Sequence, residues 1–252
     1  MNRNTMLALA SVILFCGVLT VNTLANVLPI NGLSTKQVSD LYPSLFTPAG
    51  LTFSIWSVIY VLLIGFVVLM WSRKQDVFIA TLLPWFMASC VLNMSWILAW
   101  HYLMPALSVV IMLTLLFSLS QIFMLLQSHR AVDMKEKIFV FLPFTLYFGW
   151  ICVATIANVS ALLVSVRWEG GFLSPEAWTV VMMCVAATLS AFVALRFRAT
   201  AFVVVVLWAL LGIYLRWNTT DYAAINGTAI VLLIGLTIVF VLSLRKQPGT
   251  HA

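Results

Sequence analysis

The chain has 252 residues, of which 63% are hydrophobic and only 8% are charged. Soluble globular domains carry about 25% charged residues, so this composition excludes that class and indicates a protein with several membrane-spanning segments. The formal net charge of +6 does not indicate a nucleic-acid partner, because the basic residues lie between the apolar segments rather than in one patch. The expected surrounding is the lipid bilayer.

Eight apolar segments have close to the ~20 residues that a helix needs to cross a bilayer. They are Thr5–Val27, Leu51–Trp71, Val77–Trp100, Met104–Gln127, Ile138–Val164, Ala177–Leu195, Ala199–Leu215 and Tyr222–Leu244. Backbone amides and carbonyls inside lipid must form hydrogen bonds within the protein, which a helix achieves within one segment. The sequence therefore predicts an all-α membrane bundle of about eight transmembrane helices.

The distribution of Lys and Arg predicts the orientation of these helices, because cytoplasmic loops are enriched in both residues. With a cytoplasmic N-terminus, ten of the 13 basic residues lie on the cytoplasmic side: Arg3, Arg73, Lys74, Arg130, Lys135, Lys137, Arg196, Arg198, Arg245 and Lys246. The outer side then holds Lys36, Arg167 and Arg216. We expect an integral protein of a bacterial inner membrane, with both termini cytoplasmic and an outer loop at residues 28–50 that acts as a lid.

Charged residues are absent from the middle of every predicted span. Intramembrane charges mark ion pathways and proton relays, so their absence argues against an ion channel, a pump or a proton-coupled transporter. The three histidines do not pair at helical spacing, and the four cysteines lack the spacing of metal ligands. We expect no metal site and no required cofactor.

Aromatic and polar residues instead recur at steps of three and four residues, which places them on one face of each helix. The second segment contributes Phe53, Trp56 and Tyr60. The third contributes Trp85, Ser89, Asn93, Trp96 and Trp100, and the fifth contributes Pro143, Tyr147, Trp150, Ala154 and Asn158. An unpaired Asn is costly in lipid, so Asn93 and Asn158 should face the bundle interior with their neighbouring tryptophans.

The three stripes predict an aromatic pocket for a flat hydrophobic ligand. The predicted ligand-binding residues are Phe53, Trp56, Tyr60, Ser89, Asn93, Trp96, Tyr147, Trp150, Ala154 and Asn158. Pro48 and Gly50 would form the hinge between this pocket and the lid. The alternative is that the asparagines only join helices. Trp71 and Trp217 lie at the ends of spans, where an interfacial aromatic belt explains them.

These motifs resemble the translocator protein family, also called TspO or tryptophan-rich sensory proteins. The resemblance lies in Pro48-x7-Trp56-x3-Tyr60, in Asn93-Met-Ser-Trp96, and in Pro143, Tyr147 and Trp150-x7-Asn158. It covers the first five segments, so the chain resembles an extended member. Residues 1–166 would form the TspO-like five-helix domain, and residues 167–252 a three-helix extension with a short cytoplasmic tail.

The resemblance implies a bundle that binds tetrapyrroles such as protoporphyrin IX or heme, often as a dimer, with a sensory or tetrapyrrole-handling role. Trp56 and Trp150 would flank the porphyrin, and they would be the reactive pair if the protein degraded porphyrin in light. One alternative is a transporter or exporter of a hydrophobic metabolite. For the last three helices, we expect packing beside the bundle or an oligomer contact.

Overall fold

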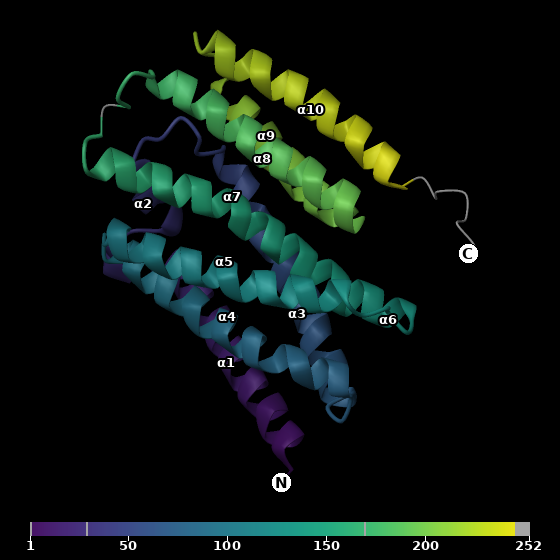
Figure 1. The fold of residues 1–252 in the computed structure, drawn as a ribbon. Helices are drawn as coiled ribbons and strands as arrows, with labels where there is room; N and C mark the ends of the chain where they lie inside the picture. Colours follow the sequence, from purple (N-terminus) through teal and green to yellow (C-terminus); the bar gives the residue numbers. More distant parts are fainter. Residues whose placement is uncertain (1, 29, 169, 245–252) are drawn as a thin grey trace.

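A computed structural model describes residues 2–28, 30–168 and 170–244, and this part of the chain is helical without strands (Figure 1). Eight of its helices are long and apolar enough to cross a membrane. The long helices are α1 (Arg3–Val27), α3 (Ile55–Ser72), α4 (Val77–His101), α5 (Pro105–Gln127), α7 (Leu142–Ser165), α8 (Pro175–Phe197), α9 (Thr200–Trp217) and α10 (Ala223–Leu244). The predicted all-α fold with eight spans is therefore confirmed. The predicted cytoplasmic tail, with Arg245 and Lys246, lies outside the described residues.

Most long helices begin where the sequence supplies a cap or a proline. The side chains of Asn2, Asp76 and Ser174 accept hydrogen bonds from backbone amides in the first turns of α1, α4 and α8. Such caps satisfy amides that have no partner inside the helix. Pro105 and Pro175 occupy the first turns of α5 and α8, where the missing amide costs nothing.

The loop at residues 30–50, which the sequence predicts on the outer side, is structured. It contains the 3₁₀ turn η1 (Ile30–Gly32) and the short helix α2 (Thr35–Asp40). Ser34 and Gln37 form a reciprocal capping box at the start of α2. Val38 on α2 is fully buried and packs in a small cluster with Trp100 and Ala161. The loop therefore packs as a cover over the ends of α4 and α7 that carry Trp100 and Ala161.

Two short irregular segments connect spans to their loops. The 3₁₀ turn η2 (Gly50–Ser54) leads into α3, and α6 (Met134–Glu136) with the π-helical η3 (Lys137–Phe141) leads into α7. Phe139 of η3 packs against Gly65 of α3, where an added Cβ would lie 2.2 Å from the phenyl ring. A glycine is therefore required on α3 for η3 to approach this closely.

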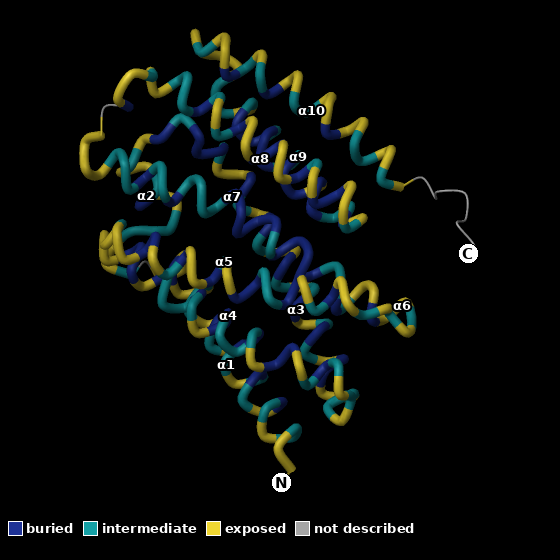
Figure 2. The backbone as a smooth tube through the Cα atoms, in the orientation of Figure 1, coloured by how far each residue is buried: buried dark blue, intermediate teal, exposed yellow. Residues whose placement is uncertain are grey.

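The helices form one continuous bundle. α4 packs between α1 and α5, α7 contacts α3 and α5, and α9 lies against the other side of α7 and also contacts α8 and α10. Buried residues concentrate on α7 and α9, whereas α10 is largely exposed (Figure 2). Phe202 of α9 is fully buried beside Gly149 of α7. One apolar cluster runs from α1 to α10, and the division at residue 166 remains a prediction.

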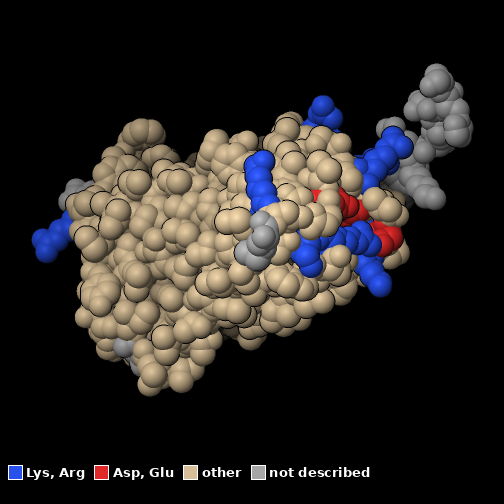
Figure 3. Space-filling view, turned by 90° about the horizontal axis from the view of Figure 1, so that it is seen from below, with Lys and Arg blue, Asp and Glu red and all other residues tan. Residues whose placement is uncertain are grey.

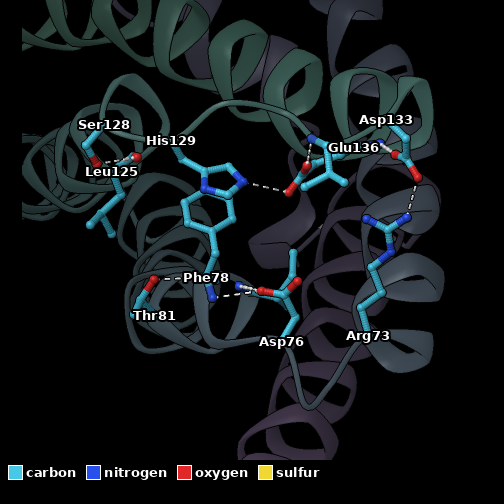
Figure 4. A network of polar contacts seen from close by, with 11 residues as sticks. Arg73, Asp76, Phe78, Thr81, Leu125, Ser128, His129, Asp133 and Glu136 are labelled. Carbon is cyan, nitrogen blue, oxygen red and sulfur yellow. Dashed lines mark hydrogen bonds and ion pairs between the residues drawn. The ribbon is translucent and has the colours of Figure 1, made fainter.

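Charged side chains on the face seen in Figure 3 gather mainly toward one end of the molecule, and a broad uncharged surface extends from them. Part of this end is a polar network (Figure 4). Arg73 pairs with Asp133, His129 contacts the buried Glu136 at 3.2 Å, and the His129 ring stacks on Phe78. A hydrogen bond from the Glu136 amide, together with Arg73, lowers the pKa of Asp133. The network fastens the loop before α7 to the turn between α3 and α4.

Candidate functional site

The aromatic residues predicted on the second and fifth spans meet in the interior. The Trp56 ring stacks on Tyr60, with centroids 5.3 Å apart. It also meets Tyr147 and Trp150 of α7 edge-to-face, at 5.6 and 6.3 Å. Phe53 contacts Trp150 edge-to-face at 6.1 Å. The two stripes therefore form one aromatic cluster between α3 and α7.

The predicted asparagines are buried, and both join helices. Asn93 of α4 donates to the Tyr147 hydroxyl at 3.1 Å and accepts a 2.8 Å hydrogen bond from Asn22 of α1. Asn158 of α7 accepts a hydrogen bond from the Trp96 indole at 3.1 Å and donates to Ser108 of α5 at 2.9 Å. These bonds fix the orientation of the side chains around the aromatic cluster.

Two cavities adjoin this cluster. The larger, of about 400 Å³, lies between α1, α3, α4 and the loop, and it is lined by Trp56, Tyr60, Trp96 and Asn22 among others. The smaller, of about 60 Å³, lies toward α7 and is lined by Trp56, Trp96 and Trp150 among others. Ligand pockets are typically 300–1,000 Å³. The larger cavity falls in that range, whereas the smaller is a narrow slot.

Two buried polar atoms at these cavities have no hydrogen-bond partner among the described residues. They are the Tyr60 hydroxyl oxygen and Trp150 Nε1. A buried polar group without a partner costs about 1–3 kcal/mol, so natural structures rarely leave one unexplained. Tyr60 lines the larger cavity and Trp150 lines the slot, so each cavity is bordered by a residue whose buried polar atom lacks a partner.

Three other predicted residues take different places. Ala154 lines the slot, where its small side chain leaves space. Tyr147 lies behind Trp56 and is nearly inaccessible. Ser89 is buried and donates to the Phe86 carbonyl of its own helix, and it lines neither cavity. Ser89 therefore does not face the space that the other residues surround.

The cover over the cavities is held by residues outside the predicted site. His101 is fully buried, and its ring nitrogens contact the Thr35 hydroxyl at 3.0 Å and the Ile30 carbonyl at 3.2 Å. Asn31 donates to the His101 carbonyl at 3.1 Å. Trp100 stacks on Trp96. One sequence feature could have predicted this contact: His101 ends an apolar span, and the loop before the second span is rich in Ser and Thr.

Helix α9 holds the segment at which the lid hinge was predicted. The Trp208 indole donates to the Thr52 carbonyl at 2.8 Å, and Arg216 donates to the carbonyls of Thr47 and Pro48 at 3.3 and 3.5 Å. Pro48 itself is buried, whereas Gly50 is exposed. The hinge residues thus lie in a segment that is bonded to the C-terminal part of the chain.

Trp217 belongs to the same contact. Its indole donates to the Leu45 carbonyl at 2.9 Å, so Trp217 helps to hold the loop, and its place in an interfacial belt stays a prediction. Its partner is a backbone carbonyl of the loop rather than a lipid headgroup. Trp71, in contrast, is 43% exposed at the end of α3, which fits an interfacial residue.

No group of three or more His, Cys, Asp or Glu residues in the described ranges could hold a metal ion. The site therefore offers aromatic faces, amides and hydroxyls. These groups bind through stacking and hydrogen bonds.

The fold and the site define a class of protein: a helical membrane bundle with an aromatic cavity beneath a loop that covers one end. A family model described as TSPO-like protein matches residues 8–242, and the chain belongs to this family. The match continues through α8, α9 and most of α10, so the resemblance extends beyond the first five helices to which the motifs had confined it. No curated protein and no solved structure showed a significant match.

Proposed function

We propose that this TSPO-like membrane protein binds a flat hydrophobic ligand of the tetrapyrrole class in the cavity beside Trp56, and serves a sensory or tetrapyrrole-handling role. The observation that carries the proposal is the pair of unpartnered polar atoms, Tyr60 Oη and Trp150 Nε1, at aromatic-lined cavities. Aromatic faces stack on a macrocycle, and the two polar atoms supply hydrogen bonds that fix its orientation.

The geometry favours a particular way of seating the ligand. Trp56 and Trp150 touch edge-to-face with planes at 87°, so this conformation leaves no gap between them for a ring. The 400 Å³ cavity has Trp56, Tyr60 and Trp96 along its walls. We infer that the ligand first occupies this larger cavity. Rotation of the Trp56 indole would then open the slot toward Trp150.

We also infer that the end of the bundle carrying Arg73, Lys74 and Arg130 is cytoplasmic, in a bacterial inner membrane. The positive-inside rule supports this orientation, since the opposite end holds few basic residues. A homodimer remains part of the proposal through the family resemblance alone.

The test is a titration of the purified protein in the dark with protoporphyrin IX, heme and a sterol. Binding is measured by the quenching of tryptophan fluorescence. Loss of one stacking partner is worth about 0.5–1.5 kcal/mol. Trp56→Ala and Trp150→Ala should therefore raise the Kd for protoporphyrin IX about two- to twelvefold.

Trp71→Ala is the matched control, because Trp71 lies exposed on the same helix as Trp56. Trp208 is not suitable as a control, because its indole donates a hydrogen bond to the Thr52 carbonyl beside the site. Equal Kd values for all the variants would exclude this cavity as the binding site. If none of the three ligands binds the wild-type protein, the proposed function is wrong.

A further inference from the structure

A third cavity opens beside the two aromatic ones and differs from them in charge. Its volume is about 260 Å³, and its lining includes Lys36, Asp40, Thr47 and Arg216. Phe53 lines all three cavities, and Lys36 and Gly50 also line the larger aromatic one. A molecule seated against Trp56 could therefore extend past Phe53 into this polar space.

The charges at this cavity do not cancel. Lys36 forms an ion pair with Asp40, whereas Arg216 forms no ion pair within the described residues. The cavity therefore has a net charge of +1 from Lys36, Asp40 and Arg216. Lys36 and Arg216 are two of the three basic residues predicted on the outer side, and both lie at the mouth of the aromatic site.

Arg216 is held in place with part of its donor capacity unused. Its Nη1 donates to the carbonyls of Thr47 and Pro48, and its guanidinium lies 5.0 Å from the Trp217 ring centroid. A guanidinium carries five N–H donors. Those on Nη2 and Nε have no acceptor in the described parts of the chain. A fixed guanidinium with free donors is suited to bind a carboxylate.

We propose that the ligand is an amphipathic acid whose carboxylate binds at Arg216, with Lys36 as the second cation, while its flat apolar part lies against Trp56. This inference rests on the proposed function and narrows its ligand class to acids. Since Arg216 belongs to α9, the C-terminal helices complete the ligand site. A neutral ligand of the same shape would leave the net positive charge at the cavity without a counterion.

The experiment compares protoporphyrin IX, a diacid, with its dimethyl ester, which keeps the ring and removes the charge. Both are titrated in the dark against the full-length wild type and against Arg216→Gln, Lys36→Gln and Arg167→Gln. Arg167 is the control, because it is an exposed basic residue of the predicted outer side and does not line the cavity. The measured quantity is the ratio of ester Kd to acid Kd. The partition of each ligand into detergent is the same for every variant, so it does not affect the change of this ratio from one variant to another.

A hydrogen bond to a charged group is worth about 1.5–3 kcal/mol. The ratio should therefore fall about tenfold or more in Arg216→Gln, less in Lys36→Gln, and not at all in Arg167→Gln. Lys36→Gln leaves the hydrogen bonds from Arg216 to Thr47 and Pro48 intact. If Arg216→Gln does not fold, a fall of the ratio in Lys36→Gln therefore tests whether the cavity binds the carboxylate. Unchanged ratios, or equal weakening of acid and ester in Arg216→Gln, would overturn the inference and leave the proposed function standing. Absence of binding by both ligands in the wild type would overturn the proposed function itself.

Discussion

Asn93 shows how much one buried polar residue can determine in an apolar bundle. Only 1% of its surface is exposed. Its amide bonds both Asn22 of α1 and Tyr147 of α7, so a single side chain from α4 links three helices. Tyr147 in turn supports the Trp56 ring. The position of the main aromatic wall of the cavity therefore depends on a residue that does not line that cavity.

Replacing Asn93 with leucine, which has a similar volume, should destabilise the protein. The change removes one of the two acceptors of the Asn22 amide, which keeps the Val18 carbonyl, and leaves the buried Tyr147 hydroxyl without its donor. A buried group left unpaired costs about 1–3 kcal/mol. We expect a clear fall in the melting temperature in detergent, together with weaker porphyrin binding.

Asn218→Ala is the control for this change. Asn218 is exposed, and its side chain makes no hydrogen bond within the described residues, so its replacement should leave the melting temperature unchanged. A melting temperature for Asn93→Leu at the wild-type value would show that the link between the three helices contributes nothing to stability.

Single-helix periodicity was enough to predict that Asn93 and Asn158 face inward, and both are buried. It could not predict Asn22 as the partner. Residues of α1 show no polar stripe that distinguishes one face, and pairing between helices depends on their relative rotation. The unpartnered Tyr60 hydroxyl also follows from the packing of several helices together, which no pattern along one segment contains.

Contacts between whole elements explain the role of α9. This helix holds the segment from Leu45 to Thr52 through its backbone and three side chains. The Gly212 carbonyl accepts a hydrogen bond from the Ala49 amide at 2.9 Å. The side chains that donate hydrogen bonds to this segment are Trp208, Arg216 and Trp217. Their partners are irregular backbone carbonyls and amides of a loop. A search for periodic polar stripes could not detect them, so the sequence predicted only packing beside the bundle or an oligomer contact.

Gly212→Ala tests this contact. An added Cβ would lie 2.0 Å from Thr52 Oγ1 and 2.9 Å from Pro48 Cβ, so α9 and the loop would have to separate. Overpacking of this kind typically costs about 1–3 kcal/mol, against at most ~1 kcal/mol gained from helix propensity. We expect a lower melting temperature and weaker binding of protoporphyrin IX, because Pro48 and Phe53 move with the loop.

Gly235→Ala is the matched control on α10, where an added Cβ would meet no atom within 4 Å. This variant should be neutral or slightly more stable, since alanine is the better helix former. If both glycine variants behave alike, the close approach of α9 to the loop does not matter for stability or binding.

At the scale of the whole molecule, hydropathy alone defined the eight spans to within a few residues of their observed ends. This success follows from the need to satisfy every backbone group inside lipid. The arrangement of the helices was harder to predict from the sequence, because the surfaces that face lipid and those that face the core are both apolar. Hydropathy therefore does not indicate that α9 packs more extensively against α7 than α8 does.

The even number of spans places the start of α1 and the end of α10 on the same side, and the basic residues predict that this side is cytoplasmic. Single cysteines at opposite ends of the bundle test this orientation, in a background with the four native cysteines replaced by alanine. Asn218 follows α9 at the predicted outer end and Ser128 follows α5 at the predicted cytoplasmic end, and both positions are exposed. A membrane-impermeant maleimide added to intact cells should label Asn218→Cys only, and Ser128→Cys should react after lysis. The reverse pattern would invert the orientation, and labelling of both in intact cells would contradict a topology in which these two loops lie on opposite sides.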